Sequence, residues 1–172
     1  HELQSYNRDT LRDGLVALSW ADKLVMHHGL GYDLPAIRKV YGDRYPIDWR
    51  NVIDTLVLSR LGNPAREGGH SLEAWGERIG AAPSKQEHSD WSQWSPEMAQ
   101  RCNTDVLITY QVYERLKPML DLMPDAVATE HTIANECHKV WKRGFKLDVP
   151  YAQGLVADLM AEQADQLADF VT

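Results

Sequence analysis

The chain has 172 residues, of which 44% are hydrophobic and 25% are charged, which is enough for one domain and part of another. Its net charge of −7 argues against a basic coat that binds nucleic acid without specificity, but not against an acidic metal site that meets nucleic acid locally. Since no apolar run approaches the roughly 20 residues of a membrane span and no segment reads as a signal peptide, we expect a cytoplasmic protein without membrane attachment.

The cysteines and the two ends of the chain indicate the kind of protein to which it belongs. Cys102 and Cys137 are far apart and occupy apolar helical positions, so we expect reduced core thiols. The chain begins at His1 and stops at Thr172 inside an amphipathic pattern. We therefore expect a piece of a longer protein whose inventory of catalytic residues is incomplete.

Alternating strand and helix signals run along most of the chain and predict an α/β architecture. The expected elements are a helix at 9–21, a strand at 23–27, a helix from Leu34, a strand starting at 51–54 and passing into 55–61, a helix at 71–79, a polar loop at 81–95 and a helix opened by Ser95 and Pro96. The pattern is helical after Leu120, with a stop at Gly144 and a new helix from Asp148. We place a boundary at Pro124, giving segments 1–123 and 124–172.

Asp105 is an acid at the centre of an apolar helical stripe. At about 100° per residue it falls in one arc with five other side chains. These are Met98, Cys102, Thr109, Tyr113 and Leu116. A carboxylate in that position needs a cation or the rim of an active site, because an unpaired buried charge is costly. Arg101, four residues earlier, offers the simpler alternative of an ion pair along the helix.

Asp33 is a second acid at an informative position, following an apolar run and a turn rich in glycine and opening a helix. One interpretation is a helix cap, since a carboxylate at this point satisfies free N–H groups. The other is a functional carboxylate at a strand-to-helix junction. The local sequence leaves both open.

Several other residues carry smaller hypotheses. Asp54 is expected to have a structural role at a strand end, and His131 to be a solvated helix position. Trp91 and Trp94 could stack on unpaired bases or anchor their loop in the core. His27 and its neighbour are expected on opposite faces of a strand, which makes joint metal ligation unfavourable.

Ordered blocks of the chain resemble the 3′–5′ proofreading exonuclease of family A DNA polymerases, especially the replicative polymerases of short-tailed phages, within the ribonuclease-H-like DEDD superfamily. The blocks are VMHHGLGYDLPA at 25–36 and NTDV at 103–106, which look like the second and third exonuclease motifs, VIDTLVLSRL at 52–61, HSLEAWG at 70–76, and KRGF at 142–145 followed by Asp148. The resemblance implies a ribonuclease-H-like fold lacking its first strands, followed by the helical start of a polymerase region.

The family's chemistry gives each matching residue an expected role. Phosphodiester hydrolysis uses two divalent ions about 4 Å apart, and oxygen ligands favour Mg²⁺ or Mn²⁺. By resemblance Asp33 and Asp105 would be metal ligands, and His28 and Tyr32 would contact the terminal nucleotides. The implied partners are the single-stranded 3′ end of a DNA primer and the polymerase domain of the same parent chain.

The chain departs from the family pattern at three points. The first motif, Asp-x-Glu, has no counterpart, as we expect of a chain cut upstream of His1. His28 replaces the usual asparagine and Arg101 replaces the tyrosine that orients the attacking water, and these two departures support an alternative. Arginine only donates hydrogen bonds, and its charge could replace that of a metal ion. The alternative is therefore a degenerate domain that guides DNA as a scaffold. A free-standing RNA-trimming exonuclease is disfavoured by the polymerase-like segment from Glu130 onward.

Overall fold

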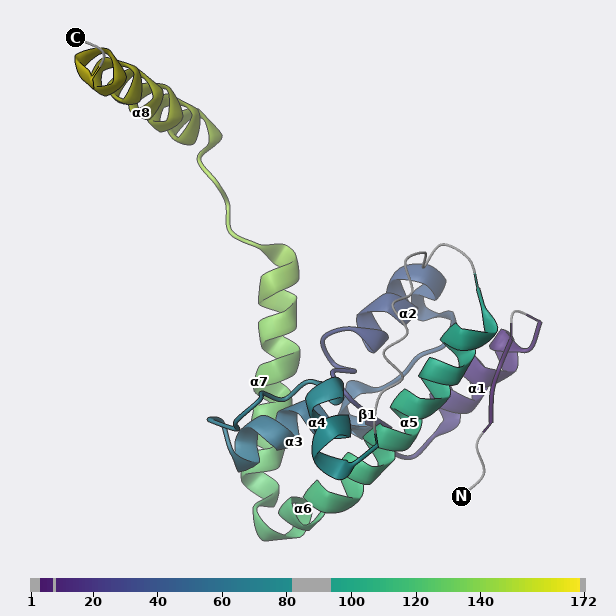
Figure 1. Ribbon diagram of the computed structural model, residues 1–172. Coiled ribbons are helices and arrows are strands. Elements are labelled where there is room, and N and C mark those ends of the chain that lie inside the picture. The colour runs from purple at the N-terminus through teal and green to yellow at the C-terminus, as the bar shows by residue number, and fades with distance from the viewer. Residues whose placement is uncertain (1–3, 8, 82–93, 171–172) are drawn as a thin grey trace. The chain divides into compact units, whose positions relative to one another are not determined.

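The computed structural model describes residues 4–7, 9–81 and 94–170 (Figure 1). The chain divides into two compact units, His1–Lys139 and Val140–Thr172. Most of the described chain is helical, and its strands form one two-stranded parallel sheet.

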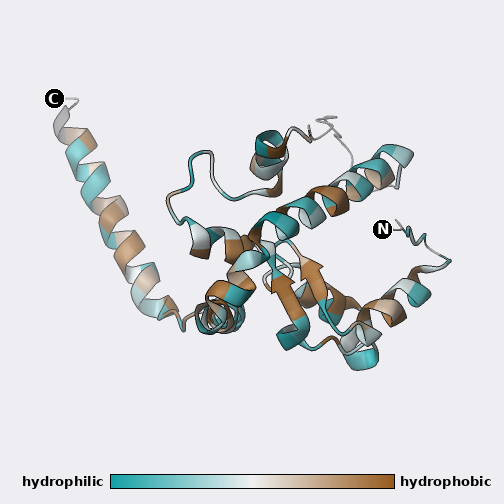
Figure 2. Ribbon diagram, turned by 90° about the horizontal axis from the view of Figure 1, so that it is seen from below, coloured by the Kyte–Doolittle hydropathy of each residue, from teal (hydrophilic) through white to brown (hydrophobic). Residues whose placement is uncertain are grey.

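The first unit opens with a helix, which is followed by two strands joined through a second helix. The elements are α1 (Leu11–Trp20), β1 (Leu24–Met26), α2 (Asp33–Tyr41), the 3₁₀ turns η1 (Gly42–Arg44) and η2 (Trp49–Asn51), and β2 (Val52–Asp54). The strands pair in parallel with Leu24 opposite Val52 and Met26 opposite Asp54. Both strands are short and mainly hydrophobic (Figure 2), and Leu24 and Val52 are buried.

Five helices complete the first unit and run to its end. They are α3 (Thr55–Gly62), α4 (Leu72–Ile79), α5 (Pro96–Leu116), α6 (Pro118–Leu122) and the greater part of α7 (Pro124–Arg143). Side chains cap three of them. Asp54 accepts a hydrogen bond from the Leu56 N–H, Ser71 accepts one from Ala74, and Ser95 accepts one from Met98. The predicted start of α5 at Ser95 and Pro96 is confirmed.

The core of the first unit has two hydrophobic clusters. One joins α3, α4, α5 and α7 through Leu58, Trp75, Ile108, Val112, Leu116 and Val127. The other surrounds the strands and contains Leu24, Leu30 and Val52. Helix α5 packs against β1, α3 and α4, and it lies beside the first strand in Figure 1. The long helix therefore contributes to the first cluster and also packs beside β1.

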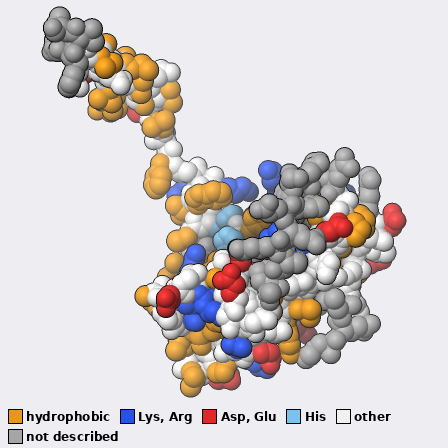
Figure 3. All heavy atoms as spheres, in the orientation of Figure 1, with side chains coloured by type: hydrophobic (Ala, Val, Ile, Leu, Met, Phe, Trp, Pro, Cys, Tyr) orange, Lys and Arg blue, Asp and Glu red, His pale blue; other side chains and the backbone are white. Residues whose placement is uncertain are grey.

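The second unit contains the last turn of α7 and helix α8 (Val149–Phe170). Gly144, with φ of 68°, follows α7 in the left-handed conformation that commonly ends a helix. Asp148 accepts a hydrogen bond from the Tyr151 N–H at the start of α8. Hydrophobic side chains are visible along α8 (Figure 3), and neither hydrophobic cluster includes a residue of this unit.

Most predicted elements are confirmed within one or two residues at each end, including the strand at 23–27 and the stop at Gly144. The strand predicted to start at 51–54 and continue through 55–61 is only partly confirmed, because the chain is a strand at Val52–Asp54 and a helix from Thr55. The polar loop lies largely outside the described residues, and Trp91 lies there too. The ribonuclease-H-like fold stays a prediction, as does the boundary between 123 and 124. Helix α7 begins at Pro124, and Val127 is buried in the first unit.

Two expectations about burial are wrong. Cys102 and Cys137 are exposed instead of being core thiols. The buried stripe of α5 consists of Ile108, Val112 and Leu116, because α3 and α4 cover that face of the helix. For Trp94, two interpretations were open, and its side chain is 73% exposed, which argues against the anchoring of its loop in the core.

Candidate active-site cleft

A cleft of about 580 Å³ lies between the end of β1, the start of α2 and the middle of α5. Four predicted site residues line it: His28, Tyr32, Asp33 and Asp105. We call it the acidic cleft. Leu18 of α1 and Leu72 of α4 contribute apolar walls. The fold therefore brings together two acids that are far apart in the sequence, because α5 crosses beside β1.

Asp33 is the first residue of α2 and faces this cleft. The residue at the capping position is Tyr32, and no side chain makes a capping hydrogen bond there. Burial raises the pKa of Asp33, and the nearby Asp54 carboxylate raises it further, while its own backbone N–H and His28 lower it. The folded site thus disfavours the ionised carboxylate, which a bound cation would stabilise.

Asp105 reaches the same cleft from the middle of α5 and is half-buried. Burial raises the pKa of Asp105, and the charge of Arg101 opposes this rise without cancelling it. Arg101 is exposed and does not line the cleft. It acts on Asp105 through its charge from one turn away.

The loop that carries His28 and Tyr32 is fixed by Asp54. One oxygen of the Asp54 carboxylate accepts hydrogen bonds from the N–H groups of His28 (2.9 Å) and Leu56 (3.0 Å), and the other accepts one from Leu30 (3.1 Å). Asp54 is 1% exposed, so these bonds satisfy a buried charge. The expected structural role of Asp54 is confirmed.

His28 adopts a left-handed backbone conformation, with φ of 65°. Asparagine, aspartate and histidine accept this conformation more readily than other residues with a Cβ atom. Close packing also explains Gly31, because a Cβ atom there would lie 2.5 Å from the His28 ring. The turn places the His28 ring at the cleft while its amide is held by Asp54.

His131 was predicted to be a solvated helix position, and this is wrong. It is 7% exposed, and its Nε2 accepts a hydrogen bond from the Asp54 N–H at 2.9 Å. Its Nδ1 lies 2.8 Å from the Val127 carbonyl, so the ring is a neutral tautomer that donates to that oxygen. Helix α7 is thereby attached to the residue that holds the His28 loop.

His27 is a cleft residue that the sequence analysis missed. It lines the cleft together with His28, although alternation along a strand predicts opposite faces. The reason is that β1 ends at Met26, so strand geometry does not extend to either histidine. Its Nδ1 lies 2.8 Å from the Thr55 hydroxyl. Burial lowers the pKa of His27, against the nearby Asp54 charge, which raises it.

The described residues of the acidic cleft include two carboxylates, which is fewer than a divalent-metal site needs. Asp33 and Asp105 offer oxygen ligands of the kind that Mg²⁺ and Mn²⁺ prefer. Over 4–7, 9–81 and 94–170, however, no three His, Cys, Asp or Glu side chains are grouped so that they could hold a metal ion. The two carboxylates fit as members of a larger ligand set and do not complete one themselves.

The fold and the cleft define a mostly helical domain with a pair of parallel strands whose carboxyl ends open onto two acids. Within the described ranges, no helix has both the length and the apolar character needed to cross a membrane. No family model matches the chain.

The chain is similar to DNA polymerases of phages. It is 29% identical over 189 residues to the DNA polymerase of Mycobacterium phage D29, a match that covers 94% of this chain and 30% of that protein. It is 27% identical over 199 residues to the DNA-directed DNA polymerase of Enterobacteria phage T3, covering 84% and 28%. For the DNA-directed DNA polymerase of Escherichia phage T7, the identity is 26% over 220 residues, covering 96% and 30%. The chain spans less than a third of the length of these relatives.

Proposed function

We propose that this chain carries part of a 3′–5′ proofreading exonuclease domain, with a ribonuclease-H-like fold, and the helical start of the polymerase region of a phage-type DNA polymerase. The observation that carries the proposal is the convergence of Asp33 and Asp105, both with a raised carboxyl pKa, in one cleft beside His28 and Tyr32. Its substrate is the single-stranded 3′ end of a primer. The similarity to DNA polymerases supports this choice of substrate.

The chain's own residues contribute binding and positioning. Tyr32 is 69% exposed at the cleft, where its ring can stack against a terminal base. His28 stands beside it on a loop that Asp54 fixes before any substrate arrives. Divalent ions, when bound, supply the charge that activates water and stabilises the leaving oxygen. Asp33 and Asp105 would be two of their ligands, and the remaining carboxylates would come from the parent polypeptide.

A scaffold that guides DNA without cleaving it is the second candidate. It is favoured by the incomplete ligand group in the described ranges and by the charge of Arg101 acting on Asp105. In this version the acidic cleft holds a primer end in place and the polymerase domain of the same parent chain does the chemistry.

Cleavage by the full-length protein that carries this chain separates the two candidates. We expect Asp33→Ala or Asp105→Ala to slow Mg²⁺-dependent removal of a mispaired 3′ nucleotide by more than about 100-fold, the upper range for losing a residue that merely supports a ligand. Primer extension should be unchanged. Asp43→Ala is the matched control, because this carboxylate lies just after α2 and is exposed.

Two results would reject the exonuclease. One is cleavage by the Asp33 and Asp105 variants at the rate of the unchanged protein. The other is an unchanged protein that removes the mispaired nucleotide no faster than a variant with both Asp33→Ala and Asp105→Ala. That result would leave the scaffold as the function. In the scaffold case Arg101→Tyr tests whether the defect lies at that position, since a gain of cleavage would locate it there.

A further inference from the structure

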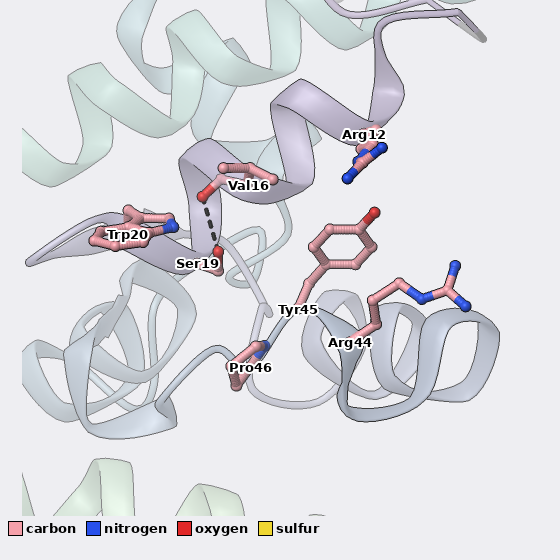
Figure 4. A pocket seen from close by; sticks show the side chains of 7 residues that line it. All are labelled: Arg12, Val16, Ser19, Trp20, Arg44, Tyr45 and Pro46. Carbon is pink, nitrogen blue, oxygen red and sulfur yellow. Dashed lines mark hydrogen bonds between the residues drawn. The ribbon is translucent and has the colours of Figure 1, made fainter.

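A second cleft, of about 760 Å³, lies against a different face of α1 from the acidic cleft. Helix α1 contributes Arg12 and Trp20, and the segment after α2 contributes Arg44 and Tyr45 (Figure 4). We call it the arginine cleft. Leu18 of the same helix lines the acidic cleft instead. The two clefts thus lie on either side of one helix within one compact unit.

The two arginines of this cleft are not paired with an acid among the described residues. Arg12 and Arg44 make no hydrogen bond or ion pair in the part of the chain that the structure describes. Acids that follow α2 in the sequence are engaged elsewhere: Asp43 lies 3.9 Å from Arg38, and Asp48 lies 2.6 Å from Arg50. In a chain with a net charge of −7, two free guanidinium groups at one cleft form a local site for an anion.

Aromatic side chains stand beside these arginines. Trp20 is 83% exposed at the end of α1, and the hydroxyl end of the Tyr45 ring points toward Arg12 in Figure 4. Guanidinium groups bind phosphate through two parallel hydrogen bonds, and an open indole face accepts a stacked base. Phosphate and base together make a nucleotide unit.

We propose that the arginine cleft binds a segment of single-stranded DNA, with Arg12 and Arg44 on phosphates and Trp20 stacked on a base. The choice of a strand over a free nucleotide rests on the proposed function, since a strand is the substrate there. The cleft gives the strand a second point of attachment on the far side of α1 from the acidic cleft.

Binding to a labelled oligothymidylate tests the proposal, measured by fluorescence anisotropy in EDTA with the 172-residue chain. Arg12→Ala and Arg44→Ala should each weaken binding and reduce the slope of log K against log salt by about 0.7, the value for one phosphate contact on a single strand. Trp20→Ala should weaken binding at least about fivefold without changing that slope. Arg115→Ala is the control, because this exposed arginine of α5 lines neither cleft.

Salt slopes that match the unchanged chain in both arginine variants overturn the proposal, as does an equal loss in Arg115→Ala. Displacement of the oligonucleotide by an equal concentration of thymidine monophosphate also overturns it, because the cleft would then take free nucleotides. Failure of the proposed exonuclease function can be distinguished from failure of the binding proposed for the arginine cleft. Binding in EDTA requires no cleavage, so an inactive Asp33 site leaves the expected slopes in place.

Discussion

At the scale of single residues, three carboxylates of the first unit have contrasting surroundings. Asp54 is fully buried but accepts hydrogen bonds from three backbone N–H groups, so its charge is compensated. Asp33 and Asp105 are less buried, yet the pKa of each is raised. A position that keeps an uncompensated carboxylate reduces stability, and such residues are concentrated at functional sites.

Asp105→Asn should therefore stabilise the folded chain at neutral pH. In the folded state the pKa of Asp105 lies above its ordinary value, so burial costs nothing at low pH, where the carboxyl is protonated in both states. The cost is complete once the pH exceeds the folded pKa. We expect the melting temperature of the variant to rise by about 1–2 °C at pH 7, since solvent screens a half-exposed group.

Thermal unfolding at a series of pH values measures this effect. The difference between the variant and the unchanged chain should shrink as the pH falls from the folded pKa of Asp105 towards the ordinary carboxyl pKa of about 3.9, and should be absent well below that value. Asp121→Asn, at an exposed position on α6, should leave the melting temperature unchanged at every pH of the series. A variant that is less stable at pH 7 would mean that Asp105 has a favourable ion pair with Arg101.

At the scale of elements, α7 is attached to the strands by one buried ring. His131 accepts the Asp54 N–H, and the Asp54 carboxylate holds the loop that enters the acidic cleft. His131→Ala leaves that N–H buried without a partner, which costs about 1–3 kcal/mol. Urea unfolding should show this loss, whereas Thr132→Ala, an exposed neighbour on α7, should stay within about 0.5 kcal/mol of the unchanged chain.

The conservative variant makes this test specific. The amide oxygen of His131→Gln can accept the same hydrogen bond, so it should lose less stability than His131→Ala. If His131→Ala and Thr132→Ala were equally stable, the hydrogen bond to Asp54 would have no measurable role.

The sequence predicted the elements better than their buried faces. The strands could be found because short apolar runs lie between turn residues, and the α5 start because Ser95 and Pro96 are typical capping residues. The burial of His131 could not be predicted, because its hydrogen-bond partner is a backbone N–H on a strand distant in the sequence. Burial of Ile108 depends likewise on where α3 and α4 pack.

The acids of the candidate site could be predicted from the sequence, but several other residues that line it or hold it in place could not. Asp33 and Asp105 could be selected because an acid at a strand-to-helix junction or inside an apolar stripe is unusual. His27 could not be selected in this way, because the direction of its ring depends on the residue at which β1 ends. The arginine cleft has no sequence motif, since Arg12 and Arg44 meet only through folding.

At the scale of the whole molecule, stability should reside in the first unit. Both hydrophobic clusters lie within it, and the described residues of the second unit belong to neither. The first unit also depends on α7, because Val127 belongs to one cluster, Ala134 packs on the other, and His131 bonds to Asp54. Folding should therefore tolerate a cut after Lys139 but not a cut before Pro124.

Two truncated chains test this division. We expect the chain 1–139 to unfold in one cooperative thermal transition close to that of the full chain, since it keeps both clusters. The chain 1–123 should lose cooperativity, because removing α7 exposes the cluster around Leu58 and Ile108 and leaves the Asp54 N–H unpaired. Far-ultraviolet circular dichroism measures both. Equal melting temperatures for the two chains would show that α7 contributes nothing to the first unit, and would support a domain boundary at 123.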